Sequence, residues 1–353
     1  MTILFAILLF SILIFVHELG HFLTAKASGV QVNEFSMFMG PAIWKKQIGE
    51  TLYAIRCIPI GGYCAMEGED SDTDNPRSFQ KAAWWKRLIV LVAGSAMNFI
   101  AGLVLLAIVV SPAKQFVTPV VAQIEEGCAL AGEHGIQVGD RILELDGEKI
   151  FVHSNFSTIL ALNGGDVHDL VLERNGERIV LDDFRMEKRE FDNGDGTASL
   201  RYGFSFSLEE ATFGKKLSYV WNSALDTVRM VRLSIQMIFN GQAGIQDMSG
   251  PVGIVQVMSD SAAQSETALD ALMTMLSFGS FIAINLAVMN LLPIPALDGG
   301  RVVCLLLTTA VEAVTKKKIN PKYEGYLHAA GMILLLILMA VIIFKDIFVL
   351  FKG

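Results

Sequence analysis

Three residues near the N-terminus have types and a spacing that could do chemistry: His17, Glu18 and His21 form the pattern HExxH. Two histidines four residues apart on a helix project from one face, where they can hold one zinc ion. The glutamate lies beside the metal without being a ligand. Its carboxylate can take a proton from an attacking water and pass it to a leaving amine. The pattern therefore predicts zinc at His17 and His21, with Glu18 as a general base.

A catalytic zinc site needs a third protein ligand and an open position for water. The other acidic residue within a long apolar region is Asp298, in the run NLLPIPALDGG at 290–300. Pro293 and Pro295 break a helix there, and irregular backbone at membrane depth is tolerated only against protein or a watered cavity. We expect Asp298 to face an internal site as the third ligand. The alternative is an interfacial aspartate that caps a helix beginning at Gly299.

The composition is apolar: 52% of residues are hydrophobic and 18% charged, with a net charge of -8 and a mean hydropathy of +0.48. Soluble domains average about 25% charged residues, so a soluble enzyme, a nucleic-acid binder and a disordered protein are all disfavoured. Four stretches are long and apolar enough to span a bilayer: 1–25 with HExxH, 87–112, 271–311 with NLLPIPALDGG, and 325–350. The first could instead be a signal peptide, but no basic segment precedes its apolar run and no cleavage pattern follows.

Lysine and arginine residues near these stretches predict their orientation, because cytoplasmic loops carry an excess of both. They gather in residues 26–86 and again before the fourth span, at Lys316, Lys317, Lys318 and Lys322. Both connections should be cytoplasmic, which leaves the termini and residues 112–278 outside. That segment holds 24 of the 36 acidic and 13 of the 28 basic residues, as a polar acidic domain would. His17, about 24 Å along the first helix, and Asp298 then lie at one depth, towards the cytoplasmic face.

Together these features resemble the site-2 protease family (M50) of intramembrane zinc metalloproteases, specifically the bacterial regulator-of-sigma-E protease type with a single PDZ domain. The similarity covers essentially the whole chain. It rests on HELGH at 17–21, the run at 290–300, Gly61-Gly62-Tyr63, the AGSAMNF segment that contains Asn98, and a region similar to PDZ domains. Two positions depart from the family: Phe38 stands where a glycine is usual, and Ser95 where many relatives have proline.

The resemblance implies zinc held by His17, His21 and Asp298, with Glu18 as the catalytic base, in a protease that cleaves a transmembrane helix of another protein. Its partners would be single-span membrane proteins, such as anti-sigma factors or remnant signal peptides, and membrane lipids, with no nucleic acid. The chain would lie in the bacterial cytoplasmic (inner) membrane and serve a stress response. Further site residues are expected to bind substrate: Asn290 near the scissile bond, Gly61 and Gly62. Asn98 is either a substrate residue or a polar residue of helix packing.

The expected fold is a multi-span α-helical membrane protein with four transmembrane helices, a membrane-associated β-hairpin region on the cytoplasmic side at 26–86, and an inserted extracytoplasmic PDZ-like α/β domain. In the hairpin region, 51–60 is expected to be a strand that ends in a turn at Gly61-Gly62 and pairs with 31–36. An edge strand there could hold a substrate extended by β-addition; a plain cytoplasmic hairpin is the alternative. The acidic residues that follow are expected in a solvated loop: Glu67, Glu69, Asp70, Asp72 and Asp74.

The PDZ-like domain is expected at 115–190, where Asp146-Gly147 and Asn175-Gly176 are hairpin markers between apolar alternations. Such a domain could bind peptide C-termini or limit substrate entry by size. Residues 191–270 should add extracytoplasmic strands and an amphipathic helix near 209–239. That helix would lie on the outer membrane surface or pack on the PDZ-like domain.

The same ligands fit a second class of function, a membrane metal transporter or metal-dependent scaffold with His17, His21 and Asp298 as a transit site. A transport path would want more ligands, and the apolar stretches up to Phe344 add only His328 to the acids and histidines already named. A metalloprotease of soluble peptides is a third possibility. The four cysteines form no CxxC pair and no regular framework, so structural disulfides are not expected.

Overall fold

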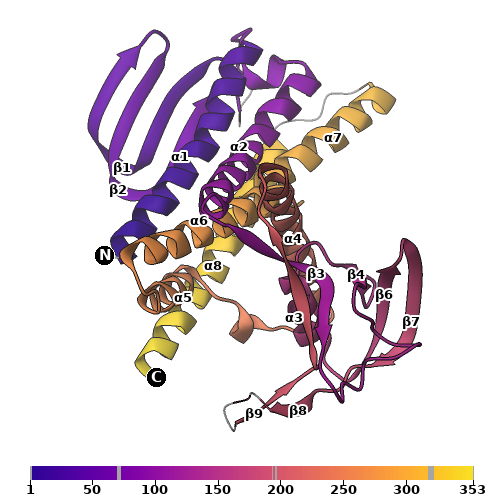
Figure 1. The fold of residues 1–353 in the computed structure, drawn as a ribbon. Coiled ribbons are helices and arrows are strands. Elements are labelled where there is room, and N and C mark those ends of the chain that lie inside the picture. The colour runs from indigo at the N-terminus through magenta and orange to yellow at the C-terminus, as the bar shows by residue number, and fades with distance from the viewer. Residues whose placement is uncertain (1, 70–72, 193, 195–196, 317–321, 353) are drawn as a thin grey trace. The chain divides into compact units, whose positions relative to one another are not determined.

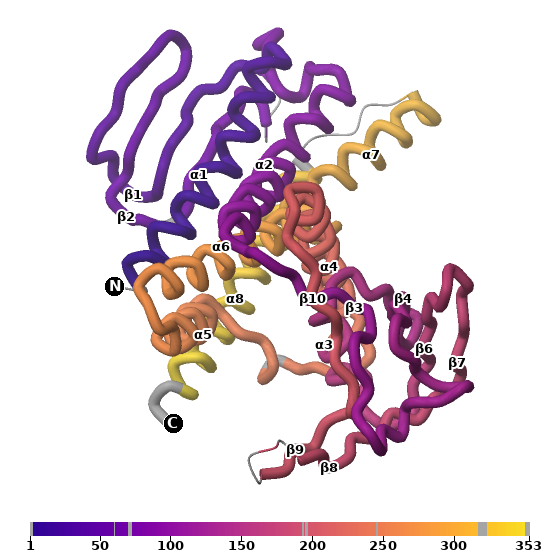
Figure 2. The backbone as a smooth tube through the Cα atoms, viewed as in Figure 1, coloured from indigo at the N-terminus to yellow at the C-terminus, as the bar shows by residue number. Residues whose placement is uncertain are grey.

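The computed structural model describes residues 2–69, 73–192, 194, 197–316 and 322–352. The chain folds into two compact units, one built from Met1–Val109 with Thr227–Gly353 and the other from Val110–Asp226. Figures 1 and 2 show the order of the elements along the chain. Asp70 and Asp72 of the expected acidic loop, and Lys317 and Lys318 of the expected basic connection, lie outside the described residues.

Within the described residues, four helices are long and apolar enough to cross a membrane: α1 (Thr2–Ser28), α2 (Trp84–Val110), α6 (Ala268–Asn290) and α8 (Lys322–Lys352). A helix satisfies its own backbone hydrogen bonds, which a lipid environment requires. The four helices agree with the four expected spans, and the chain is an integral membrane protein. The first unit also contains α5 (Pro251–Ala263) and two short 3-10 helices, η1 (Phe79–Lys81) and η2 (Ile245–Asp247).

The third expected span, 271–311, is not one continuous helix. α6 ends at Asn290, residues 291–297 are irregular, and α7 (Asp298–Thr315) follows. Pro293 and Pro295 lack amide donors, so the helix cannot continue through them. α7 begins at Asp298 itself and its N-cap is Leu297. The alternative of a helix that begins at Gly299 with Asp298 as its cap is therefore wrong.

Close contacts between small residues hold the helices of the first unit together. A Cβ on Gly20 of α1 would lie 2.5 Å from the carbonyl oxygen of Ala93 on α2. The hydroxyl of Ser280 on α6 donates to the carbonyl of Gly102 on α2 at 2.8 Å. Small residues allow this close packing where lipid supplies no hydrophobic force between helices. The result is a fixed framework in which α1 and α2 lie side by side (Figure 1).

The chain between α1 and α2 forms a small sheet of β1 (Val32–Ile48) and β2 (Thr51–Met66), which pair antiparallel with several register shifts. Residues 34–37 pair with 52–55 and also with 62–65. Residues 32–37 are therefore an inner strand, and 62–66 form an edge. The expected turn at Gly61-Gly62 is wrong: both glycines lie inside β2, where Gly61 has φ +78° at an irregular position of the ladder. The sheet lies alongside α1 (Figure 1), where the Phe35 and Phe22 rings are 4.7 Å apart.

The second unit is an antiparallel sheet in the order β10-β3-β4-β6-β7, with β5 paired to β4 and α3 (Ser154–Asn163) packed against the core. Its strands are β3 (Gln115–Ile124), β4 (Arg141–Leu145), β5 (Glu148–Lys149), β6 (Val167–Arg174), β7 (Glu177–Arg185) and β10 (Phe204–Glu210). A separate hairpin pairs β8 (Arg189–Asp192) with β9 (Ala198–Arg201). The sheet extends past the expected boundary at 190 because β10 pairs with β3.

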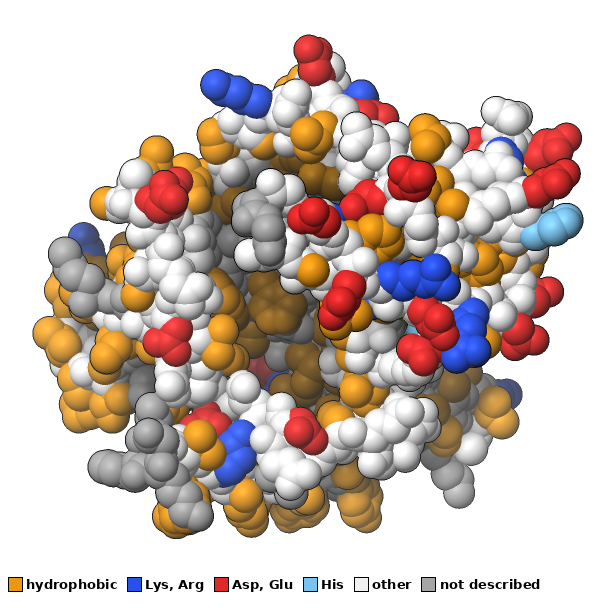
Figure 3. Space-filling view, turned by 60° about the horizontal axis from the view of Figure 1, so that its bottom comes forward, with side chains coloured by type: hydrophobic (Ala, Val, Ile, Leu, Met, Phe, Trp, Pro, Cys, Tyr) orange, Lys and Arg blue, Asp and Glu red, His pale blue; other side chains and the backbone are white. Residues whose placement is uncertain are grey.

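The long helix α4 (Phe213–Phe239) begins in the second unit. There the Tyr219 ring stacks on Phe116 of β3 with centroids 4.5 Å apart, and Asn155 of α3 donates to Asp226 at 2.7 Å. The N-terminal half of α4 thus packs on this domain, which was one of the two alternatives for the helix. Figure 3 shows acidic side chains spread over one face of the molecule.

Candidate metal centre

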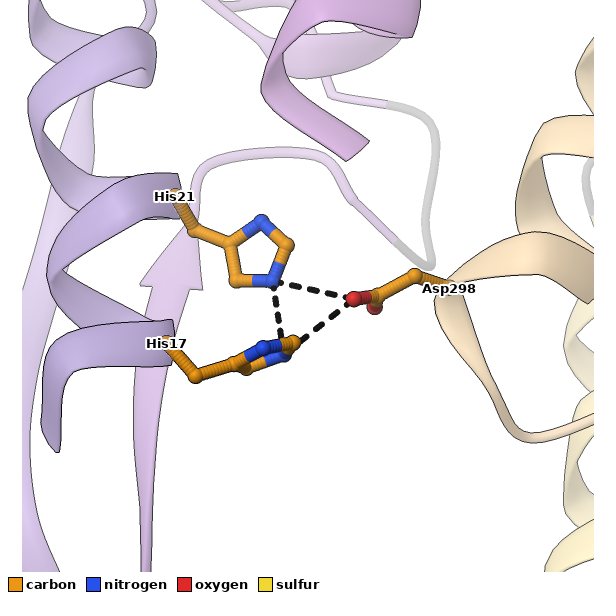
Figure 4. Close-up of side chains that lie close together, drawn as sticks. All are labelled: His17, His21 and Asp298. Carbon is orange, nitrogen blue, oxygen red and sulfur yellow. Dashed lines mark hydrogen bonds and ion pairs between the residues drawn. The ribbon is translucent and has the colours of Figure 1, made fainter. Parts of the chain in front are cut away.

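Two histidines on α1 and an aspartate at the start of α7 meet at one point. The Nε2 atoms of His17 and His21 lie 3.1 Å apart, and Oδ2 of Asp298 lies 3.1 Å from the first and 3.3 Å from the second (Figure 4). The histidines are four residues apart on α1, so both imidazoles project from one face of that helix. Among the described residues this is the one group of three histidine, cysteine, aspartate or glutamate side chains whose possible ligand atoms all lie within 4.8 Å of one another.

The size of this triangle fits a zinc ion. Ligand atoms about 2.0–2.1 Å from a tetrahedral zinc lie about 3.3 Å from one another, close to the 3.1–3.3 Å found here. Oδ2 of Asp298 is buried and meets no donor in hydrogen-bonding geometry among the described residues. A buried carboxylate oxygen without a donor is costly unless a cation takes that place. Two imidazole nitrogens and one carboxylate oxygen are also a donor set that zinc prefers.

The ring of His21 is oriented by a backbone group. Its Nδ1 lies 2.8 Å from the carbonyl oxygen of Val90 on α2. A carbonyl can only accept, so Nδ1 carries the proton and Nε2 presents a lone pair to His17 and Asp298. Metal-bound histidines in proteins are commonly fixed by such a bond to the other ring nitrogen. The tautomer of His21 is therefore set by the fold of α2.

α2 also provides the space in which the two imidazoles meet. A Cβ on Gly94 would lie 2.4 Å from Nε2 of His21 and 2.7 Å from Cε1 of His17. Any larger residue would displace at least one of the rings. Four residues further along, Asn98 is 1% exposed, and its Nδ2 lies 3.4 Å from Nδ1 of His17.

Glu18 lies beside the triangle and is bound to the edge strand. Its carboxylate accepts a hydrogen bond from the backbone N–H of Cys64, and its Cγ lies 3.5 Å from the place a Cβ on Gly62 would occupy. Glu18 therefore stands between the two histidines in sequence and against β2 in space. This is a position from which a carboxylate can act without being a ligand.

A cavity of about 630 Å³ opens onto these groups. It is lined by His17, Glu18, His21 and Asp298, by residues 63–69 at the end of β2, and by Arg301 of α7. Arg301 forms an ion pair with Glu69 at this cavity. The cavity thus joins the three donor atoms, the neighbouring carboxylate and one edge of the sheet.

The residues expected to bind substrate have different surroundings. Gly62 lies next to Glu18, and Gly61 precedes the lining segment of β2. Asn98 is buried between helices and directed at His17. Asn290 is the last residue of α6, before the irregular segment that leads to Asp298. The sequence did not single out Val90, and it included Gly94 only as part of the segment AGSAMNF; the spacing of four that both share with Asn98 could have suggested one helix face.

The fold and the site define a class of protein. The two HExxH histidines meet an aspartate from another helix, and the glutamate beside them is not a ligand. In a membrane protein this arrangement is that of a zinc metalloprotease. The family model described as peptidase family M50 matches residues 5–338. The chain belongs to peptidase family M50, and it is a zinc metalloprotease.

Relatives match over nearly the full length. A candidate zinc metalloprotease of Clostridium acetobutylicum is 34% identical over 351 residues, which cover 98% of this chain and 97% of that protein. The zinc metalloprotease RasP of Oceanobacillus iheyensis is 28% identical in an alignment of 435 positions, gaps included, that covers 98% of each chain. The regulator of sigma-W protease RasP of Bacillus subtilis is 25% identical in an alignment of 431 positions, which again covers 98% of each chain. Both RasP alignments are longer than the 353 residues of this chain, so each contains more than 75 positions at which this chain has no counterpart.

Proposed function

We propose that the protein hydrolyses peptide bonds inside transmembrane segments of other membrane proteins, with zinc held by His17, His21 and Asp298. The observation that carries the proposal is the position of these donor atoms: two are on a helix long and apolar enough to span a bilayer, and the third follows another such helix. Ionisable groups at such positions are costly and are retained for function. A substrate must therefore reach the zinc within or at the edge of the membrane.

Glu18 is the general base in this proposal. Bound zinc supplies a Lewis acid and a water that ionises near neutral pH. Glu18 takes the proton of the attacking water and delivers it to the leaving amine. The Cys64 N–H fixes one side of the Glu18 carboxylate, and the cavity leaves room for a peptide on the other side. Fixing a base in this way reduces the reorganisation needed during the reaction.

The edge of β2 at 62–66 is proposed to hold the substrate. A helical peptide bond is shielded by its own hydrogen bonds, so the substrate must be extended before water can attack it. Within the described residues, 62–66 pair only with β1, and residues 63–66 line the cavity beside Glu18. An extended segment can add to such an edge through main-chain hydrogen bonds. Gly61 and Gly62 would then allow close approach of the substrate backbone, and Asn290 would contact it near the scissile bond.

The β1–β2 sheet is proposed to contact the membrane on the cytoplasmic side. Its outer part exposes large apolar side chains, including Ile43 at 73%, Trp44 at 48% and Ile48 at 55%. Lys45 and Lys46 lie next to them in sequence. Apolar and aromatic side chains beside lysines are typical of segments that sit at a membrane interface. This favours membrane association over a plain cytoplasmic hairpin.

The substrates are proposed to be single-span membrane proteins, either anti-sigma factors or remnant signal peptides. One relative's name, regulator of sigma-W protease, makes a regulatory role in that protein explicit. We further propose that the second unit is a single PDZ-like domain outside the cytoplasm of a bacterial inner-membrane protein, as the lysine and arginine distribution predicts. There it would bind or filter substrates before they reach the metal.

The test uses purified protein in liposomes with a single-span substrate and a soluble peptide of the same cleavage sequence. The wild type should cleave the spanning substrate, and Glu18→Gln should bind zinc in full yet lose cleavage by a factor of at least about 10². Full activity of Glu18→Gln would refute the mechanism. Faster cleavage of the soluble peptide would make the protein a protease of soluble substrates, and zinc flux without cleavage would make it a transporter.

A further inference from the structure

One stripe of α2 faces the metal centre. Val90, Gly94 and Asn98 are spaced by four residues, so they share one face of the helix. The Val90 carbonyl contacts Nδ1 of His21, Gly94 leaves room for both rings, and Asn98 contacts Nδ1 of His17. Each imidazole therefore has its second nitrogen against α2. For His21 the partner is a backbone group, and for His17 it is a side chain.

Asn98 is set back from the cavity that opens onto the donor atoms. Its side chain is 1% exposed and lies between helices. Among the described residues that line the cavity beside Glu18, Asn98 is not included. A peptide in that cavity would meet His17 and Glu18 first. The expected substrate-binding role of Asn98 therefore has no support in its position.

The amide of Asn98 can affect His17 in two opposite ways. Its nitrogen and oxygen ends have the same shape, and the hydrogen-bond network decides which one faces the ring. If nitrogen faces Nδ1, it donates to that atom and the proton of the imidazole moves to Nε2, facing Asp298. If oxygen faces Nδ1, it accepts the Nδ1 proton and Nε2 keeps a lone pair. Oδ1 of Asn98 is buried and otherwise meets no donor among the described residues, so the second arrangement also satisfies this oxygen.

We propose that Asn98 is a positioning residue for the metal: its side-chain oxygen accepts the Nδ1 proton of His17 and keeps Nε2 of that ring available to zinc. This rests on the zinc site proposed above. It gives His17 the same arrangement that the Val90 carbonyl gives His21. A polar residue that merely packed between helices would have no effect on which ring nitrogen carries the proton.

Zinc binding tests the proposal directly. Asn98→Leu keeps the size of the side chain and removes the acceptor, whereas Asn98→Asp keeps an oxygen at the same place. Purified variants would be stripped of metal and titrated with zinc against a competing chelator, and cobalt-loaded samples would be compared by their absorption spectra. We expect Asn98→Leu to bind zinc about 10–100-fold more weakly with an altered cobalt spectrum. Asn98→Asp should stay within about threefold of the wild type, well short of that loss.

Ser280→Ala is the matched control for packing, because the Ser280 hydroxyl is buried and donates to Gly102 on the same helix α2. It should lower the melting temperature of the metal-free protein and leave zinc affinity unchanged. Wild-type zinc affinity in Asn98→Leu would overturn the proposal. So would a loss in Asn98→Asp as large as in Asn98→Leu, or a raised KM with full zinc occupancy in Asn98→Leu. A wild type that binds no zinc would instead refute the site itself.

Discussion

The backbone N–H of Ala296 donates a hydrogen bond of 2.9 Å to Nδ1 of His328, which joins the loop before Asp298 to α8. Ala296 has φ +82°, a left-handed conformation that costs a residue with a side chain about 1–2 kcal/mol. One turn further along α8, Gly331 allows Pro295 to approach: a Cβ there would lie 2.5 Å from that of Pro295. The position of Asp298 thus depends on two residues of α8 that need not contact the metal.

Replacement of His328 should therefore weaken zinc binding from a distance. His328→Leu removes the acceptor and leaves the Ala296 N–H without this partner, at a cost of about 1–2 kcal/mol. His328→Asn places an oxygen where Nδ1 stood. We expect a lower melting temperature and weaker zinc affinity in the leucine variant, with substantial recovery in the asparagine variant. If both variants lose zinc equally, the hydrogen bond to Ala296 is not what fixes the loop.

Gly94→Ala should abolish zinc binding with little harm to the helix. The added methyl group would lie 2.4 Å from Nε2 of His21, so the ring must leave its place. Alanine itself is favoured over glycine in a helix by up to about 1 kcal/mol. The measurement is the zinc-to-protein ratio after purification.

Gly102→Ala is the control for that substitution. It lies on the same helix, where a Cβ would meet Cγ1 of Ile284 at 2.5 Å, away from the three donor atoms. It should reduce stability and retain zinc. Full zinc occupancy in Gly94→Ala, or equal loss in both variants, would contradict the proposed role of the space at Gly94.

The parts of this site that depend on residue type could be predicted from the sequence. HExxH in an apolar stretch, and an aspartate after two prolines in another, led to His17, His21 and Asp298. The four spans follow from hydrophobicity. The Val90 carbonyl could not be predicted, because a backbone group has no sequence signature. Gly94 acts only by lacking a side chain, and the pairing of β10 with β3 joins segments far apart in the chain.

One prediction from local composition, the turn at Gly61-Gly62, is wrong. Gly61-Gly62 has the composition of a turn, yet both residues continue β2, because residues 32–37 pair with this part of the strand as well as with 52–55. The strand is therefore longer than the expected 51–60, because β2 runs on to Met66. Whether two successive glycines form a turn or a bulge depends on the strands that pair with them, and that pairing is a property of the whole sheet.

Asp298→Asn tests the third ligand with almost no change in shape. The amide keeps one oxygen but removes the negative charge that offsets the metal, so zinc affinity should fall by at least about 10-fold. Stability of the metal-free protein should rise or stay equal, because the buried negative charge is removed and its Oδ2 meets no donor in hydrogen-bonding geometry. Calorimetric zinc titration and thermal melting without metal measure the two effects. Unchanged zinc affinity would remove Asp298 from the ligand set.

Glu50, in the turn between β1 and β2, should give the fold a measurable dependence on pH. Its carboxylate accepts hydrogen bonds from Arg77 at 2.5 and 2.9 Å and from Lys26 at 2.7 Å. The bonds from Arg77, followed by that from Lys26, lower the pKa of Glu50 from 4.5 to about 2. A lowered pKa in the folded state stabilises the fold above the unfolded value. That stability is lost as the pH falls from about 4.5 towards 2.

Glu50→Gln should therefore melt below the wild type at pH 7, and the difference should shrink below pH 4.5. Glu133→Gln, at an exposed position of the second unit, is the control and should melt like the wild type throughout. A difference between Glu50→Gln and the wild type that stays constant from pH 7 to pH 3 would mean that ionisation of Glu50 does not contribute to stability.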